Sequence, residues 1–338
     1  MDIRTGIGGR TKMKRPKYHS FFAEEINAFL DYRESTGMDI SADARYQKLL
    51  DNFFTENDVK GTGITREIAD LWRRKRDRES EHHHYMRVNH TKRMLEYLFA
   101  KGFPVATIRD VKPPKSNFVP HIYTDDEIKR YFLVVDSYGE THPGNMKNRV
   151  QLSVLFRVLY CCGCRITETL MLRVKDVDLH EGFFRLKVTK GNKERIVVMS
   201  SSLHTLMQRY ADMTFHMLTE NDFIFTNRYG QALRRDWVED LHERLLAMAN
   251  ISALSENGYR KRLHDWRHTF AVHAFKQMVD SGMDMYVSLP ILSAYLGHSS
   301  IAATENYVRL ATVLYPYLQE RFNTVLDKLF GKEVDNGN

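Results

Sequence analysis

The chain has 338 residues, of which 43% are hydrophobic and 28% are charged, and its formal net charge is +7. This length allows two domains with separate cores, and the composition is that of an ordinary soluble globular protein rather than a disordered or fibrous one. No apolar run is long enough to span a bilayer and the N-terminus does not look like a secretory signal, so we expect a cytoplasmic protein without membrane contact. The positive charge suggests a polyanionic partner, although such a modest excess also occurs in proteins that bind no nucleic acid.

Residues 1–18 form a basic arm in which the only acidic residue is Asp2. Such an arm is usually just solvated, but it can also follow a phosphate backbone. The candidate DNA-contacting residues of the arm are Lys12, Lys14, Arg15 and Lys17.

Residues 19–108 are predicted to form a compact bundle of four short helices. Apolar residues recur at helical spacing from Phe21 to Leu30 and from Tyr46 to Phe54. A third helix is predicted to begin at Thr65 and to continue through the basic stretch 72–78, and a fourth to end near Gly102. The basic stretch offers four further candidate DNA contacts, for which a solvated face is the alternative: Arg73, Arg74, Lys75 and Arg76.

Residues 109–121 are rich in proline and charge and lack periodicity, which predicts a linker. A second domain is then expected over 122–330, with a tail at 331–338. Its first helix is predicted to begin at Thr124, which is followed by acidic residues suited to a first helical turn. Residues 150–173 are predicted to be helical, with an interruption at Gly163.

The three cysteines, Cys161, Cys162 and Cys164, stand beside this interruption. An odd number in a long chain argues against a disulfide framework and for a reducing compartment. No second ligand group at a suitable spacing completes a zinc site, so we expect no metal and interpret the cysteines as small buried helix residues.

The periodicity changes at residues 183–198, where alternating apolar residues flank the glycine turn 191–193. This pattern is typical of a β-hairpin, and it places Lys190 at the tip. The remainder of the chain is again mostly helical. The predicted fold class is therefore mainly α with a small β-sheet or hairpin.

The last quarter of the chain combines residues suited to chemistry at a phosphodiester. A phenol such as that of Tyr307 needs a proton acceptor and a phosphorus centre freed from charge repulsion. Arg165 and Arg267 are suited to bind two phosphate oxygens, because an arginine fork donates two charge-assisted hydrogen bonds. His264 lies three residues before Arg267, on the same helix face, and Lys190 is a candidate general acid. Taken singly, each of these residues also has an ordinary structural explanation.

Together the motifs resemble those of the tyrosine recombinase (phage integrase) family. Residues 163–178 look like the family's first active-site box, Gly-x-Arg followed by Glu and by Leu-x-x-x-Asp. Residues 190–198 are similar to its lysine-bearing hairpin, residues 264–271 match the second box, and residues 296–307 match the third, Leu-Gly-His-Ser and a tyrosine nine residues after the histidine. The resemblance covers about residues 122–320, which would be a mixed α/β catalytic domain. The helices before it fit the family's SAM-like core-binding domain by pattern.

The resemblance implies a role for each matching residue. Arg165 and Arg267 would bind the scissile phosphate, Lys190 would protonate the 5′ oxygen, and Tyr307 would form a 3′-phosphotyrosyl link. His264 would be the general acid/base partner, and His298 the second histidine that holds the phosphate. Glu168 and His268 would support the site, and Lys193 is the alternative to Lys190. Family members need no metal, cofactor or ATP for this chemistry.

The implied function is site-specific DNA recombination, as in the integration, excision or transposition of a mobile element. The implied partner is double-stranded DNA, bound by a homotetramer on two sites, with related recombinases or accessory DNA-bending proteins left open and the bacterial nucleoid as the location. The apolar C-terminal residues, among them Leu318, Phe322 and Leu326, either pack in their own subunit or dock into a neighbour. Three alternatives are Xer-like dimer resolution, type IB topoisomerase-like relaxation of DNA, and a DNA-binding regulator without catalysis.

Overall fold

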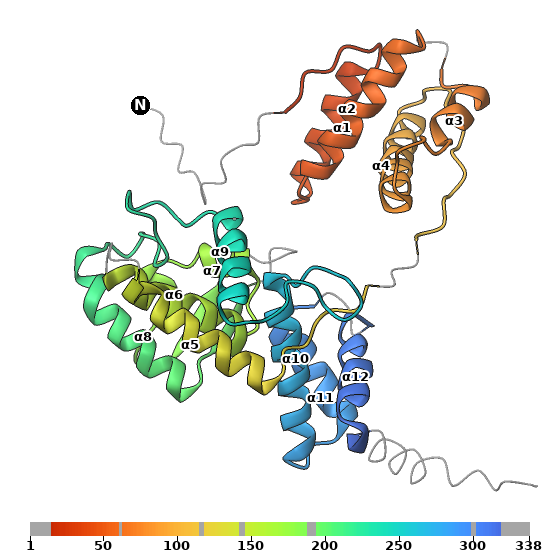
Figure 1. The fold of residues 1–338 in the computed structure, drawn as a ribbon. Coiled ribbons are helices and arrows are strands. Elements are labelled where there is room, and N and C mark those ends of the chain that lie inside the picture. Colours follow the sequence, from red (N-terminus) through yellow and green to blue (C-terminus); the bar gives the residue numbers. More distant parts are fainter. Residues whose placement is uncertain are drawn as a thin grey trace, which may run out of the picture. The chain divides into compact units, whose positions relative to one another are not determined.

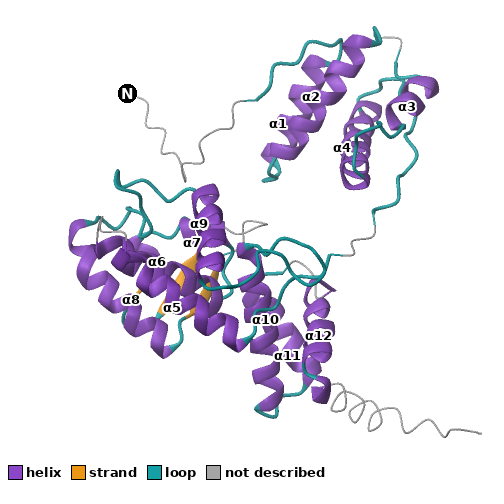
Figure 2. Cartoon of the chain, viewed as in Figure 1, coloured by secondary structure: helices purple, strands orange, loops and turns teal. Residues whose placement is uncertain are grey.

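The computed structural model describes residues 15–60, 63–114, 118–141, 146–187, 194–298 and 302–318. The chain divides into two compact units, Met1–Asn117 and Phe118–Asn338, called here the N-terminal unit and the C-terminal unit. Helices dominate both units, and the C-terminal unit also contains short strands (Figure 1 and Figure 2). The predicted fold class is therefore confirmed. None of the helices in the described ranges is long and apolar enough to cross a membrane.

The described part of the N-terminal unit contains helices at the four predicted places. Side-chain caps begin two of them, since Thr65 accepts from the backbone N–H of Ile68 and Ser80 accepts from that of His83. Large side chains such as Phe22 are fully enclosed between the helices, so this unit has its own core. The bounds are α1 (Ala23–Ser35), α2 (Ser41–Glu56), α3 (Arg66–Arg73) and α4 (Glu81–Ala100).

The basic stretch is a loop from Arg74 onward, which corrects the prediction that all of it continues the third helix. Helix α3 ends at Arg73, and Arg74 has an extended backbone with φ −58° and ψ 135°. The buried guanidinium of Arg87 donates to the carbonyl oxygens of Trp72 and Arg74, which a further helical turn would need. Arg87 also pairs with both carboxylate oxygens of Glu79, each at 2.7 Å. A side chain from α4 thus fixes the course of the loop.

The end of the predicted N-terminal arm is part of the folded unit. Arg15 donates to Asp31 at 2.6 Å and to Glu34 at 2.5 Å, both on α1. Tyr18 is buried, and its hydroxyl donates to the backbone oxygen of Ala44 at 3.2 Å. These contacts correct the expectation of a solvated arm for Arg15 and Tyr18.

The C-terminal unit begins with the predicted helix cap. The Thr124 hydroxyl accepts from the backbone N–H of Glu127 at 3.2 Å, and the Glu127 carboxylate accepts from that of Thr124 at 2.9 Å. The predicted interruption at Gly163 is also present, between α6 and α7, where φ is +58°. The helices are α5 (Asp125–Thr141), α6 (Met146–Cys161), α7 (Ile166–Leu170), α8 (Ser201–Thr214), α9 (Arg235–Met248), α10 (Leu263–Asp280), α11 (Met285–Leu296) and α12 (Ala302–Leu314), with 3-10 turns η1 (Val174–Asp176) and η2 (Phe215–Met217).

All three cysteines are free, and Cys162 and Cys164 are buried while Cys161 is half-buried. Cys161 ends α6, and the other two lie in the turn that follows it rather than in a helix. Burial raises the pKa of the Cys161 thiol and raises that of Cys164 to about 12. The thiols are therefore protonated and unreactive at neutral pH.

The described strands form one small antiparallel sheet in the order β1-β2-β3. Strands β2 (Phe183–Leu186) and β3 (Arg195–Val198) are the two arms of the predicted hairpin, with Phe184 opposite Val197 and both side chains fully buried. Strand β1 (Val177–Asp178) was not predicted, because two residues are too few to show an alternating pattern.

Helix α10 connects two hydrophobic cores. Near its start, the Trp266 indole stacks on Tyr123 in the larger core, with ring centroids 4.0 Å apart and planes at 13°. Farther along, Phe275 packs in a second core with α11 and α12, and Figure 1 shows these three helices side by side in blue. Because one helix takes part in both cores, the polar residues of its first turns are held in place by packing on both sides.

A buried histidine lies beside Trp266. His242 of α9 is 2% exposed, and its ring nitrogens lie 2.7 Å from the hydroxyl of Tyr131 and 3.3 Å from that of Tyr123. Burial lowers the pKa of His242 to about 3, so this residue is neutral at neutral pH.

We expect the protein to lose stability on mild acidification because of His242. Between pH 6.5 and about 3 the unfolded chain binds a proton that the folded chain excludes. The free energy of unfolding therefore falls as the pH falls, by about 2 kcal/mol from this residue between pH 6.5 and pH 5. Urea titrations at the two pH values measure the change. In His242→Gln the difference between the two values should shrink by about 2 kcal/mol, and an unchanged difference would contradict the explanation.

Candidate active site

Arg165 lies directly after the glycine turn, at the start of α7. Its guanidinium donates to Glu168 at 2.7 Å and to the carbonyl oxygen of Gly297 at 3.4 Å, and its backbone N–H donates to the other Glu168 oxygen at 2.9 Å. A Cβ at Gly163 would lie 2.3 Å from the ring of Phe270, and φ there is +58°. A side chain at this position would displace the turn that presents Arg165, which explains the glycine.

Arg267 of α10 links the first predicted motif to the third. Its guanidinium donates to the carbonyl oxygens of Gly163 at 2.7 Å and Leu296 at 2.6 Å, and the residue is 1% exposed. Burial, and after it the charge of Arg165, lowers the pKa of Arg267 to about 10. Arg267 therefore stays protonated at neutral pH. The neighbouring guanidinium groups of Arg165 and Arg267 together favour the binding of an anion beside them.

Tyr307 of α12 is 4% exposed and packs between two imidazoles. Its ring is nearly parallel to that of His298, at 5.9 Å and 16°, and tilted to that of His268, at 5.6 Å and 49°. Burial raises the pKa of Tyr307, and this effect outweighs the charge of Arg267, which lowers it. The phenol is thus protonated at neutral pH, and it needs a proton acceptor before it can act as a nucleophile.

The other predicted histidines complete this group of rings. His264 and His268 lie one turn apart on α10, with ring centroids 4.7 Å apart. His298 follows the left-handed Gly297 that ends α11, and its Nδ1 lies 2.9 Å from the hydroxyl oxygen of Thr304. Because Thr304 occupies Nδ1, the other ring nitrogen of His298 is left for a ligand.

The three histidines are neutral at neutral pH. Burial, followed by neighbouring basic groups, lowers the pKa of His268 to about 3 and that of His298 to about 4. Desolvation and then the charge of Arg267 also lower the pKa of His264, although this residue is exposed and solvent weakens both effects. Neutral imidazoles can accept a proton, and a bound anion would raise their pKa.

A further guanidinium, which the sequence did not predict, belongs to the same cluster. Arg195, at the start of β3, donates to both carboxylate oxygens of Glu168, at 2.9 and 2.8 Å. Glu168 therefore binds two arginines, Arg165 and Arg195. In the sequence, the only sign of Arg195 is its position two residues after Lys193 on a predicted strand.

Lys190 and Lys193, the candidate active-site lysines, lie outside the described residues. The described parts of the hairpin are β2, which ends at Leu186, and β3, which begins at Arg195. The choice between the two lysines stays a prediction.

The predicted DNA contacts of the N-terminal arm have different surroundings. Lys12 and Lys14 lie outside the described residues, and Lys17 is exposed. Arg15 is half-buried against the two α1 carboxylates.

Four basic residues lie at the end of α3 and in the loop after it, and Arg73, the last residue of the helix, has a structural role. Arg73 donates to the backbone oxygens of Arg109 at 3.0 Å and Asp110 at 3.2 Å. The other three are exposed. Lys75 is paired with Glu81, and the Arg76 guanidinium lies 5.0 Å from the centre of the Trp72 ring. The carbonyl oxygen of Arg74 accepts a hydrogen bond from Arg87.

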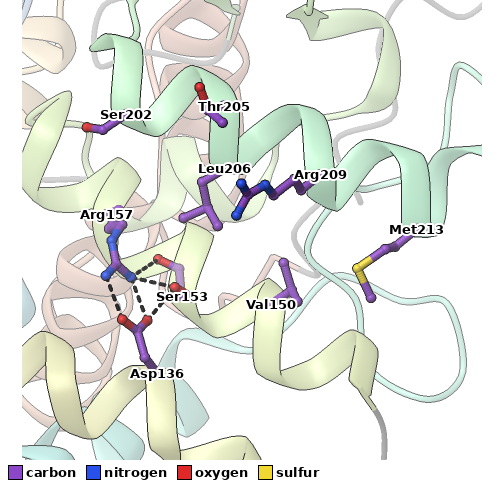
Figure 3. Close-up of a pocket in the computed structure, with 9 residues that line it drawn as sticks. All are labelled: Asp136, Val150, Ser153, Arg157, Ser202, Thr205, Leu206, Arg209 and Met213. Atoms are coloured by element: carbon purple, nitrogen blue, oxygen red, sulfur yellow. Dashed lines mark hydrogen bonds and ion pairs between the residues drawn. The ribbon is translucent and has the colours of Figure 1, made fainter.

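A groove of the C-terminal unit contains none of the predicted site residues. It encloses about 550 Å³ between α5, α6 and α8, and Figure 3 shows an ion pair on its wall, Arg157 with both oxygens of Asp136, each at 2.8 Å. In the described parts of the chain, no three His, Cys, Asp or Glu residues come together as a potential metal site.

The cluster at α7, α10 and α12 thus offers two guanidinium groups to an anion, a buried phenol beside them, and neutral imidazoles on both sides of the phenol. This combination suits transfer of a phosphoryl group to the tyrosine.

The chain is similar in sequence to known proteins. A model of the phage integrase family matches residues 124–313, more than half of the chain. A putative integrase/recombinase of Sinorhizobium fredii, y4rB, is 24% identical over 298 residues, which are 86% of this chain and 93% of that protein. Tyrosine recombinase XerD of Staphylococcus epidermidis is 30% identical over 220 residues, 64% of this chain and 66% of that protein.

A solved structure shares the fold. The XerH site-specific recombinase, bound to a palindromic difH substrate in a post-cleavage complex, aligns with a TM-score of 0.65 at 16% identity. The alignment covers 92% of this chain and 97% of that one.

Proposed function

The chain belongs to the phage integrase family of tyrosine recombinases, and we propose that it cuts and rejoins double-stranded DNA through a covalent link between Tyr307 and a 3′ phosphate. The observation that carries the proposal is the burial of the Tyr307 ring between His298 and His268, on a helix that packs against α10. Arg267 of α10 links the backbone of the first and third motifs. This arrangement supports Tyr307 as the nucleophile and Arg267 as one of the charges that would hold the phosphate.

In the cutting step Tyr307 attacks the phosphorus of one strand. Its oxygen forms a bond to phosphorus, and the bond from phosphorus to the 5′ oxygen breaks. Arg165 and Arg267 bind the two non-bridging oxygens and stabilise the negative charge that gathers on them.

Two proton transfers complete this step. The phenol proton passes to a neutral imidazole, with His264 in the role of acid/base partner and His298 as a donor to the phosphate. Lys190, or Lys193 in its place, gives a proton to the leaving 5′ oxygen. Rejoining is the reverse reaction, in which a 5′ hydroxyl attacks the phosphotyrosine. The energy of the phosphodiester is kept in that link, so no ATP is needed.

The N-terminal unit would serve as the core DNA-binding domain, and the C-terminal unit as the catalytic domain. Arg74 and the other exposed residues of the loop after α3 are the best-placed candidates for phosphate contacts, because Arg87 holds this loop in a fixed course. Binding of this kind should weaken steeply with salt concentration.

We further propose a homotetramer on two DNA sites, located on the nucleoid, with exchange of mobile-element DNA as the role. Xer-like dimer resolution is the nearest alternative. Leu318 is fully buried in the core formed by α10, α11 and α12, so this residue packs in its own subunit. Phe322 and Leu326, the other residues of the docking hypothesis, lie outside the described residues.

Trapping the covalent complex tests the proposal. A binding duplex is first recovered from a random-sequence pool, and a nick is then placed at successive positions so that a short 5′-hydroxyl fragment leaves after cutting. We expect a complex that survives denaturation, formed with a chelator present and without ATP. No covalent product on any nicked duplex would contradict the proposal and favour a regulator. Relaxation of supercoiled DNA that lacks the selected site would favour the topoisomerase alternative.

A further inference from the structure

We propose that Arg195 is a positioning residue of this active site: it holds Glu168 so that Arg165 keeps both its direction and its positive charge for the phosphate. The inference rests on the proposed function and adds to it a residue to which none of the motifs assigned a role.

The hydrogen bonds around Glu168 show how the three side chains are tied. Glu168 is 2% exposed and accepts four hydrogen bonds, two from Arg165 and two from the fork of Arg195. The Arg195 side chain is itself only 10% exposed. A carboxylate with two oxygens has few further acceptor positions, so neither arginine can turn without breaking bonds to Glu168.

The charges of this trio explain why a second arginine is needed. Burial opposes ionisation of Glu168, but hydrogen bonds from Arg195 and then from the Arg165 backbone lower its pKa, so the carboxylate is charged at neutral pH. With Arg165 as its only partner, it would cancel the charge meant for the phosphate. With Arg195 present, one carboxylate faces two guanidinium groups and a net positive charge remains.

Arg195 also lies against the turn that presents His298. A Cβ at Gly297 would lie 3.1 Å from Nη1 of Arg195 and 3.3 Å from its Cδ, and the carbonyl oxygen of the same glycine accepts from Arg165. The two arginines therefore contact the residue directly before His298 from separate elements. Loss of Arg195 would loosen this turn as well as Glu168.

The orientation of the Arg195 side chain is set by Glu168 rather than by its other contacts. Its buried Nε has no hydrogen-bond partner within the described residues, although an unsatisfied buried donor costs about 1–3 kcal/mol. Both Nη atoms nevertheless point to the two oxygens of one carboxylate. This arrangement is the bidentate geometry that arginine provides and lysine does not.

Three variants test the inference on the trapping substrate. Arg195→Gln should form the covalent complex about 100-fold more slowly, the scale expected for a small misplacement of a reacting group. Its affinity for the duplex should stay within about threefold, since Arg195 is buried. Arg195→Lys keeps the charge without the fork, and it should form the covalent complex at a rate between those of Arg195→Gln and the wild-type chain. Arg157→Gln removes a bidentate pair of the same kind from the groove in Figure 3 and should react at the wild-type rate.

A substrate that carries no charge at the cut position separates the positioning role of Arg195 from a general loss of structure. In a duplex with a methylphosphonate at the cut position, one charged oxygen is replaced by a methyl group, so the Arg165 charge matters less. The loss in Arg195→Gln should then shrink to about tenfold or less. Equal losses on both substrates, a wild-type rate in Arg195→Gln, or an equal loss in Arg157→Gln would overturn the positioning role. Failure of the wild-type chain to form any covalent complex would instead overturn the proposed function.

Discussion

Replacing Tyr307 by phenylalanine is expected to abolish the covalent protein–DNA complex while leaving the fold and DNA binding intact. The substitution removes only the phenolic oxygen, and the ring keeps its packing against His298 and His268. The rate of covalent complex formation should fall by at least about 10⁴-fold, as when an enzyme nucleophile is removed. The free energy of unfolding should change by about 1 kcal/mol or less, because the ring stays packed and the variant buries one polar group fewer.

Tyr295→Phe is the matched control for this prediction. Tyr295 lies on α11, its ring stacks on that of Phe270, and its hydroxyl donates to the backbone oxygen of Val198 at 3.4 Å. This variant should cut DNA at close to the wild-type rate. A covalent complex formed by Tyr307→Phe, measured on the same nicked duplex, would mean that another side chain is the nucleophile.

Arg267→Gln is expected to lower the cutting rate by about 10³-fold, with little loss of stability. Removal of a single donor to a transition-state oxyanion costs about 10²–10³-fold in known enzymes, and Arg267 would supply both a charge and a donor. The expected loss of stability is small because burial of the Arg267 charge already costs free energy on folding. A pKa lowered to about 10 corresponds to about 3 kcal/mol at neutral pH, which offsets the two lost hydrogen bonds to carbonyl oxygens.

Arg87→Gln provides the opposite case for comparison. Arg87 is also 1% exposed, but it is paired with the carboxylate of Glu79. Its removal leaves that charge unpaired and should lower the free energy of unfolding by about 3–5 kcal/mol. Urea denaturation of both variants, together with rates on the nicked duplex, measures the contrast. A rate within tenfold of wild type in Arg267→Gln, or a stability loss as large as that of Arg87→Gln, would contradict the account.

The sequence was sufficient for those features that depend on local spacing. His264 and Arg267 are three residues apart in a region predicted to be mostly helical, so their common face followed from helical geometry alone. The cap at Thr124, the turn at Gly163 and the two long arms of the hairpin were likewise local patterns. Motif order then indicated that Arg165 and Tyr307 lie close to the α10 residues, and the structure brings these side chains together.

The features that the sequence did not predict depend on contacts between distant elements. Helix α3 stops at Arg73 because Arg87, on another helix, binds the carbonyl oxygens that would continue it. Arg15 is part of the folded N-terminal unit rather than of a solvated arm, because two carboxylates of α1 bind its guanidinium. Arg195 joins the active site through Glu168, 27 positions earlier in the chain, and no local pattern encodes that contact.

Identification of the residue that becomes linked to DNA tests the central claim most directly. The wild-type chain is trapped on the nicked duplex, the complex is digested with nuclease and protease, and the peptide that carries the nucleotide is sequenced by mass spectrometry. The chain contains 17 tyrosines, so the assignment is a stringent one. We predict a nucleotide attached through its 3′ phosphate to the hydroxyl of Tyr307. A link to any other residue, or through a 5′ phosphate, would contradict the proposed mechanism.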